Sequence, residues 1–495
     1  MTDRTLSQEG PSSAFTIEAT GIEVIADADR KGRPASLFWP WFAANISVFG
    51  ISYGSWILDF GISFAQATLV AVVGTVLSFL LVGIIALAGK RGSAPTLTLS
   101  RAAFGVRGNL LPGVVSYLLL VGWEIVLVAL ATLATDTVIQ QLGWSGGNTA
   151  RIIAFLVVIA IVVGAGILGF DMIMRVQTVL TIVLGVVTLG YIALTVDQID
   201  LAALGQLPAG SWEAVLGALM LVMTALGLGW VNAAADYSRY LPRAASSGGV
   251  VFWTTFGASL APVVLIVYGL LLVGSNPDLS AGISSDPIGT LATLLPTWYL
   301  VPFVLVAVGG LVSGAVLDIY SSGLTLLAVG VRVPRWVAAA IDGLLMVVGT
   351  IVIVWFAADF FGPFQGFLIT LGVPIAAWAG IFIGDLLLRR RDYDTFSLFD
   401  ARGVYGAVNW LNVVGMLALT AIGWGLVTNG VQGLTWQGYL FGPLGLDVDT
   451  WGFSGVGVAV ALFGGLVVGL ANAGRIRRQE AATVTAPEPA VVAGE

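Results

Sequence analysis

The stretch "LGLGWVNAAADYSRY" (residues 226–240) interrupts one of the most apolar parts of the chain, which begins near Trp212. Two glycines alternate with leucines, an indole and an amide follow, and the sequence turns polar only at Asp236. A helix that only crosses a lipid bilayer needs none of these residues. Unwound backbone exposes N–H and C=O groups that lipid cannot satisfy, so it must line a cavity enclosed by protein. The stretch therefore predicts a broken membrane helix.

The composition of the chain is that of a membrane protein. Of its 495 residues, 58% are hydrophobic and 10% are charged, whereas a soluble domain carries roughly 25% charged residues. Apolar runs of about 20 residues, each long enough to span a bilayer, recur along the sequence. We expect an all-α polytopic membrane protein with about twelve transmembrane helices, at residues 38–58, 65–88, 110–138, 151–170, 174–196, 212–238, 248–274, 298–328, 335–358, 365–388, 409–428 and 452–474.

Several classes of function are excluded by what the chain lacks. It has no cysteine and no histidine, which removes disulfides, thiolate catalysis, the usual zinc sites and imidazole acid–base chemistry. A net charge of −7 argues against a nucleic-acid partner. No metal-ligand cluster, nucleophile–base pair or nucleotide-binding loop is apparent. We therefore expect neither an enzyme nor a bound cofactor, and a small molecule and the lipid bilayer as partners.

Basic residues predict the orientation, because cytoplasmic loops are enriched in Lys and Arg. With the N-terminus inside, every other connecting segment is basic, and only Arg151 lies on the wrong side. The sequence thus predicts an even number of spans in the plasma membrane, both termini cytoplasmic, and a monomer or weak homo-oligomer. Residues 1–34 and 479–495 are expected to be disordered cytoplasmic tails, without a signal peptide. The inner segment 89–113 either runs along the interface or is a plain connector.

A second interrupted span is the first one, "WPWFAANISVFGISYGSW" (39–56), with Ala44, Asn45 and Ser47 near its middle. Five spans separate it from the sixth, so the two cross in opposite directions. Paired broken helices point to the midplane site of a transporter built from inverted repeats. This pattern predicts repeats over residues 35–196 and 212–390, followed by two helices over 409–474. The alternative is that both interruptions are kinks where glycine allows close packing.

Polar residues inside spans are the candidate functional residues, because such groups are costly in lipid. Glu124 lies in span three and Asp318 in span eight. Glu124 either forms a structural hydrogen bond or serves proton carriage or substrate contact. Asp318 either bonds a helix end or a neighbouring serine, or it belongs to the site.

Aromatic residues of two spans suggest a flat ligand. Trp123 and Trp230 lie at similar depth, and an indole pair can hold a planar heterocycle by stacking, worth roughly 1–3 kcal/mol per base. Side chains such as Asn45, Asn232 and Asp318 could read the edge of the ring. With 16 tryptophans in the chain, a coincidental pair is the alternative.

The segments "WFAANISVFGISYG", "SAPTLTLSRAAFGVRGNLLPG", "VGWEIV" and "GWVNAAADYSRYLP", in this order over roughly residues 35–390, resemble the purine–cytosine permease branch of the nucleobase:cation symporter family. The resemblance implies a leucine-transporter-like fold of two inverted five-helix repeats plus two C-terminal helices. It also implies uptake of a nucleobase coupled to H⁺ or Na⁺.

Roles of single residues follow from the same resemblance. Trp123 would stack on the base, Trp230 would complete the sandwich unless Gly227 takes that position, and Asp318 would read an edge. Leu127 stands where relatives carry an amide, which puts cytosine itself in doubt. The resemblance places a possible Na⁺ site at Ala44, Ser47, Gly310 and Ser313.

Gly314 replaces a second hydroxyl expected at that cation site, and a hard cation prefers several oxygens. This favours protons as the coupling ion, with Glu124 or Asp318 as the carrier. The leading function is import of a purine or cytosine-like heterocycle by alternating access. The alternatives are transport of a vitamin B6- or thiamine-type compound, hydantoin or allantoin, and then of an amino acid. A channel is disfavoured, because paired broken helices suggest one central site.

Overall fold

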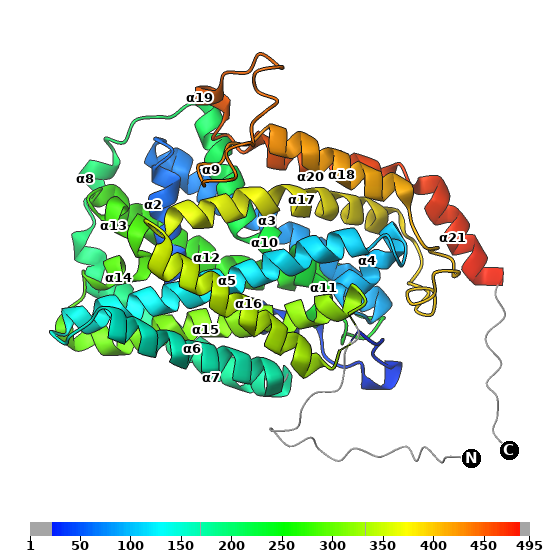
Figure 1. Ribbon diagram of the computed structural model, residues 1–495, viewed down its shortest axis with the longest axis horizontal. Helices are drawn as coiled ribbons and strands as arrows, with labels where there is room; N and C mark the ends of the chain where they lie inside the picture. The colour runs from blue at the N-terminus through cyan, green and yellow to red at the C-terminus, as the bar shows by residue number, and fades with distance from the viewer. Residues whose placement is uncertain (1–21, 169, 332, 486–495) are drawn as a thin grey trace.

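The computed structural model describes residues 22–168, 170–331 and 333–485, in which the regular elements are helices (Figure 1). A helix or a broken set of helices lies on each of the twelve expected apolar segments. They are α1 (Phe38–Asn45) with α2 (Phe49–Leu58), α3 (Phe64–Gly92), α5 (Leu110–Gln141), α6 (Asn148–Leu168), α7 (Phe170–Thr195), α9 (Trp212–Ala225) with α10 (Gly227–Trp230) and α11 (Ala234–Ser238), α12 (Ser247–Ser275), α15 (Thr297–Ala328), α16 (Arg335–Phe356), α17 (Phe361–Leu388), α18 (Trp410–Gly425) and α20 (Val456–Leu470).

Within the described ranges, nine segments are long and apolar enough to cross a membrane. The number rises to ten if α20 and the following α21 (Ala473–Thr485), which meet at a bend of 48°, form one span. The all-helical, multi-pass architecture expected from the composition is confirmed. The first span falls outside this count because its two halves are short, at 8 and 10 residues.

Short helices lie at the two ends of the bundle. In Figure 1 the long helices α5, α15, α16 and α17 run across the view. The short helices α8 (Leu201–Leu204), α13 (Leu279–Ser285) and α14 (Pro287–Ala292) lie at one end, and α4 (Thr96–Phe104) and α11 lie at the other. Asp200 and Asp286 each accept backbone hydrogen bonds at the start of α8 and α14, which satisfies N–H groups that a helix leaves free.

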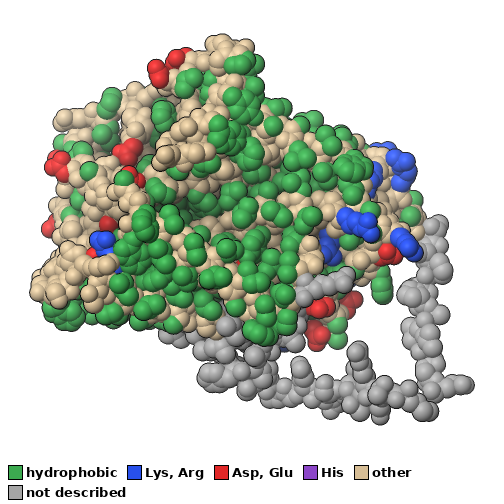
Figure 2. Space-filling model, viewed as in Figure 1, with side chains coloured by type: hydrophobic (Ala, Val, Ile, Leu, Met, Phe, Trp, Pro, Cys, Tyr) green, Lys and Arg blue, Asp and Glu red, His purple; other side chains and the backbone are tan. Residues whose placement is uncertain are grey.

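Charge divides between the two ends. Lys and Arg side chains gather at the end that holds α4 and α21, most visible acids lie at the opposite end, and an apolar band lies between them (Figure 2). Contacts join segments far apart in sequence at the basic end. Arg30 donates to the carbonyl of Leu241 at 2.8 Å, and Lys90 donates to that of Ala245 at 2.7 Å. These segments therefore share one side of the bundle, as the basic pattern predicts.

Arg151, the exception to that pattern, lies in an ion pair. Its Nε is 2.7 Å from Oδ2 of Asp136, which is 1% exposed and also accepts from the backbone N–H of Gly147. The buried carboxylate thus has a local partner at the acidic end. This pairing explains why a basic residue stands among acidic segments.

The segment 89–113 does not run along the surface. Each residue of α4 is buried, and Arg101 donates to the carbonyls of Ala328 at 2.6 Å and Leu398 at 3.1 Å. Asp236 accepts both the backbone N–H and the hydroxyl of Thr96 at the start of this helix. Of the two alternatives, the connector is the better description, although it is a buried one that ties the bundle together.

The predicted tails are ordered where they join the bundle. Residues 27–29 form a short 3₁₀ helix, Arg30 is buried beneath it, and α21 continues to Thr485. The cause is contact with the protein, since Arg389 at the end of α17 bonds the side chain of Gln479 at 2.9 Å. The remainder of each tail lies outside the described residues.

Helices α17 and α20 touch backbone to backbone. A Cβ added at Gly380 would lie 2.1 Å from the carbonyl oxygen of Leu462, and one at Gly384 would lie 2.9 Å from Cα of Gly469. Only glycine fits at such a distance, and small residues spaced by four allow close packing of membrane helices. The interface therefore holds α20 fixed against one half of α17.

Candidate functional site

The candidate site lies where two spans lose their helical winding. The first span is interrupted at residues 46–48, where Ile46 has ψ of 96°, outside the helical range. The sixth is interrupted at Leu226, with φ of −109° and ψ of −103°, and continues through a single short turn, α10. Both breaks predicted from sequence are present. Backbone N–H and C=O groups at the two breaks therefore lack the hydrogen bonds of a continuous helix inside the protein.

Trp123, on α5, lies beside the turn that follows the second break. A Cβ at Gly229 would lie 2.9 Å from its Nε1, so glycine leaves room for the indole there. The indole is half-buried, and its N–H is buried with no hydrogen-bond partner among the described residues. Phe364 and Phe367 of α17 meet Trp123 edge-on, at 5.6 Å and 5.9 Å between ring centroids. Sequence reasoning missed both phenylalanines.

Trp230 makes its ring contact elsewhere. It meets Trp41 of α1 edge-on at 5.9 Å, and Trp41 in turn meets Tyr237 at 5.2 Å. This aromatic group joins the first broken span to the sixth on the α11 side of the break. The two predicted stacking residues thus come from one region but pack against different neighbours.

Glu124 follows Trp123 on α5 and is fully buried. Its Oε1 lies 2.8 Å from the hydroxyl of Ser322 on α15, and the same hydroxyl lies 2.9 Å from Oδ2 of Asp342 on α16. Tyr117 donates to Oδ1 of Asp342. The other oxygen of Glu124, Oε2, is buried without a partner in the part of the chain described. Asp342 is missing from the sequence prediction, although it is a lone acid within an apolar span.

Asp318 lies one turn before Ser322 on α15 and is 2% exposed. It lies near Glu124 and Tyr237 inside the bundle. No hydrogen bond or ion pair joins its carboxyl to a described residue. The bond to a helix end or serine considered from sequence is therefore not found within those residues.

The remaining polar candidates have partners within the protein. Asn232 donates to the hydroxyl of Ser116 on α5 at 2.8 Å, while its carbonyl oxygen is buried and unpartnered in the described chain. Asn45 donates to the carbonyl of Trp41, one turn back on α1. A Cβ at Gly227 would lie 2.2 Å from the backbone of Ser78, so this glycine faces α3 rather than Trp123.

The residues proposed for a cation site lie near one another at the first break. A Cβ at Gly310 would be 3.7 Å from the carbonyl oxygen of Ile46, which brings α15 close to residues 44–47. Ser313 is 4% exposed, and its hydroxyl has no hydrogen bond to a described residue. Ser47 accepts from the backbone N–H of Phe49 at 3.3 Å. A Cβ at Gly314 would lie 3.0 Å from Leu127, so an apolar side chain takes the space.

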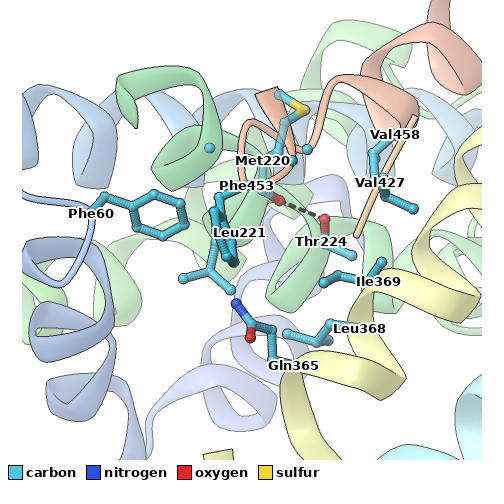
Figure 3. A pocket seen from close by; sticks show the side chains of 13 residues that line it. Phe60, Met220, Leu221, Thr224, Gln365, Leu368, Ile369, Val427, Phe453 and Val458 are labelled. Atoms are coloured by element: carbon cyan, nitrogen blue, oxygen red, sulfur yellow. Dashed lines mark hydrogen bonds between the residues drawn. The ribbon is translucent and has the colours of Figure 1, made fainter. Parts of the chain in front are cut away.

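A separate, mostly apolar cavity lies on the α9 side of the break (Figure 3). Met220, Leu221 and Thr224 of α9 line it from one side, and Gln365 and Leu368 of α17 from another. Thr224 donates to the carbonyl of Met220, which satisfies its hydroxyl within the helix (Figure 3). None of the predicted site residues lines this cavity.

Comparison with known proteins agrees with this architecture. YxlA of Bacillus subtilis (strain 168), a protein named for the purine–cytosine permeases, is 25% identical over 413 residues, which cover 80% of this chain and 85% of YxlA. The structure of Mhp1, a nucleobase-cation-symport-1 family transporter in a closed conformation with bromovinylhydantoin bound, superimposes with a TM-score of 0.65 at 18% identity and covers 96% of this chain and 97% of Mhp1.

A Na⁺-coupled sialic acid symporter has the same fold at a lower score. Its TM-score is 0.58 at 12% identity, over 90% of this chain and 91% of the symporter. These likenesses show the transporter fold. The sequence itself matches a family model described as permease for cytosine/purines, uracil, thiamine and allantoin, over residues 24–442. The resemblance noted from the motifs is thereby confirmed, and the chain belongs to this family of membrane permeases.

Proposed function

We propose that the protein is a secondary active transporter that imports a nucleobase, a purine or cytosine-like heterocycle, by symport with H⁺ or Na⁺. The observation that carries the proposal is the indole of Trp123, which lies beside the turn after the second break with its N–H buried and unpartnered among the described residues. Two further polar groups of the same bundle have no partner in the described chain, namely Oε2 of the adjacent Glu124 and the carboxyl of Asp318. An unpaired buried polar group is costly, so such a set is suited to a ligand that pairs with it.

Each group has a role in this proposal. The ring of Trp123 stacks on the heterocycle, while Asp318 hydrogen-bonds its edge. Backbone freed near Gly229 adds donors and acceptors, and Trp230 with Asn232 forms the wall on the α11 side. Asn45 and Gly227 stay in the proposed site as residues of the broken spans, although their own contacts are structural. Residues 35–196 and 212–390 act as the two repeats that alternate access.

The orientation is part of the same proposal. Because the end that holds α4 and α21 is basic, we place it in the cytoplasm, with both termini inside and the protein in the plasma membrane. The permease works as a monomer or weak homo-oligomer and catalyses no reaction. The cation is held either at Ala44, Ser47, Gly310 and Ser313 or as a proton on a buried carboxyl.

A second candidate is a related heterocycle: a vitamin B6- or thiamine-type compound, hydantoin or allantoin. Leu127 favours this second candidate, because it places an apolar group beside Gly314, where an amide would form hydrogen bonds with a base. A less polar ring edge would then be preferred. The family description names thiamine and allantoin, and Mhp1 was seen with a hydantoin.

Radiolabelled uptake tests both candidates. Cells expressing the protein take up adenine, guanine, hypoxanthine, cytosine and uracil, then pyridoxine, thiamine, hydantoin and allantoin, with sodium present or replaced by choline. We expect saturable uptake of a nucleobase that Trp123→Ala removes. Uptake of no compound on the panel above the level of empty cells would refute the proposal.

A further inference from the structure

The contacts of Ser322 require a proton on a neighbouring carboxyl. The Ser322 hydroxyl lies within 2.9 Å of an oxygen of Glu124 and an oxygen of Asp342. A hydroxyl carries one hydrogen and accepts through its lone pairs. It can form a linear hydrogen bond to only one of the two oxygens, so the other contact is a linear hydrogen bond only if that carboxyl carries the hydrogen. If Ser322 donates instead to the carbonyl of Ile319 at 3.3 Å, both carboxyls must be protonated.

The hydrogen-bond network assigns the proton to Glu124. Tyr117 donates its one hydrogen to Oδ1 of Asp342, and Ser322 can donate to Oδ2. Asp342 then has a donor on each oxygen, as an ionised carboxylate prefers. Ser322 must accept from Glu124, whose proton lies on Oε1. The unpartnered Oε2 of Glu124 is then a carbonyl oxygen rather than half of a buried anion.

The charges around the pair favour the same assignment. Asp342 and Asp318 both lie near Glu124, and Tyr117 is the titratable group beside Asp342. None of these acids forms an ion pair with a described residue, and the carboxyl of Asp318, 2% exposed, has no hydrogen-bond partner there either. Like charges in a low dielectric repel strongly. Ionising Glu124 would therefore add a second negative charge next to that of Asp342.

We propose that Glu124, Ser322 and Asp342 form a proton-binding site, and that its proton is the ion carried with the heterocycle. The inference rests on the proposed function. It names as coupling ion a proton held between α5, α15 and α16, rather than a cation at the first break. Glu124 adjoins Trp123 on α5, and Asp318 lies one turn from Ser322 on α15. Binding of the ring and binding of the proton thus involve the same two helices.

The thermodynamic linkage between proton binding and substrate binding gives the decisive measurement. If one proton binds with the substrate, the dissociation constant of the substrate rises by about tenfold per pH unit above the titration range. Purified protein is titrated with whichever of the five nucleobases is taken up best, across about three pH units. A pH-indicator dye in weakly buffered micelles reports the protons taken up on binding. We expect Glu124→Gln to remove the pH slope, while the control Asp59→Asn, at an exposed carboxyl at the end of α2, retains it.

A second measurement needs no substrate. The infrared band of a protonated carboxyl should be present in the wild type, fade at alkaline pH and diminish in Glu124→Gln. Its absence from the wild type at every pH would overturn the proton site. A base that binds with no pH slope, or sodium-dependent binding that takes up no proton, would also overturn it while leaving the transport proposal intact. Failure of every compound to bind would instead refute the transport proposal, and the infrared result would still decide on the proton. Should Glu124→Gln not fold, the wild-type measurements decide alone.

Discussion

Replacing Trp123 with alanine removes the surface on which we propose that the heterocycle stacks. Stacking of a base on an aromatic side chain is worth about 1–3 kcal/mol, which corresponds to a dissociation constant about 5- to 150-fold higher. The indole N–H has no partner among the described residues, so a hydrogen bond to the ligand, if lost as well, adds to this range. We therefore expect weakening towards its upper end.

The same substitution also has a structural effect that must be separated from binding. Trp123 has edge-to-face contacts with Phe364 and Phe367, and such pairs contribute about 0.5–1.5 kcal/mol each. Trp123→Phe keeps a ring in place and should lie between wild type and alanine in affinity. Trp230→Ala, which removes the contact with Trp41, is the matched indole deletion on the other side of the break.

Scintillation-proximity binding of the transported radiolabelled compound, on protein purified in detergent, gives the dissociation constants. Size-exclusion profiles and thermal unfolding show whether each variant is folded. A folded Trp123→Ala protein that binds as tightly as the wild type would refute the stacking argument and leave Trp123 a packing residue.

Three further predictions concern other parts of the chain. Gly229→Ala places a methyl group 2.9 Å from Nε1 of Trp123. Tilting the ring away costs about 0.5–1.5 kcal/mol, so the affinity for the substrate should fall by up to about tenfold. Gly227→Ala instead meets the backbone of Ser78 at 2.2 Å and should yield little folded protein; equal behaviour of the two variants would contradict these placements. Arg389→Ala leaves Asp385, bonded at 3.0 Å and buried, without its partner and should destabilise by about 3–5 kcal/mol, seen as a lower melting temperature; an unchanged melting temperature would show that the pair contributes nothing. Because the chain has no cysteine, the single-cysteine variants Ala244→Cys and Ala209→Cys report the orientation of the protein in the membrane. An impermeant maleimide should label position 209 on intact cells and position 244 only after permeabilisation. The reverse result would invert the proposed topology.

The breaks were predictable from sequence because their signals are local. Glycine, asparagine and serine inside an apolar run mark the two interruptions, near residues 44–47 and at 226–229. Trp123 and Glu124 stand out for the same reason, as an indole and an acid in an apolar helix. The fold follows largely from composition, periodicity and the family resemblance.

Contacts between spans left no such signal. Asp342 is visible as a lone acid, but its contact with Ser322 depends on how α15 packs against α16. Phe364 and Phe367 are two of 24 phenylalanines, and nothing in their surroundings points to Trp123. Arg101 belongs to the segment 89–113, whose course the sequence left open between the interface and a plain connector; in the structure the carbonyls of Ala328 and Leu398 accept its hydrogen bonds inside the protein. Packing between distant segments decides which groups these side chains contact, and a single sequence does not show that packing.

The glycine contact between α17 and α20 bears on which parts of the bundle are held together. Pro374 interrupts the hydrogen bonding of α17 between Phe367 and Gly380. Beyond the proline, Gly380 and Gly384 pack on the backbone of α20. The half before the proline, which carries the two phenylalanines beside Trp123, is held as well, because Trp424 and Asn429 donate to the carbonyls of Thr370 and Gly366. The C-terminal part of the chain is thus a continuous backing for α17 on both sides of its proline.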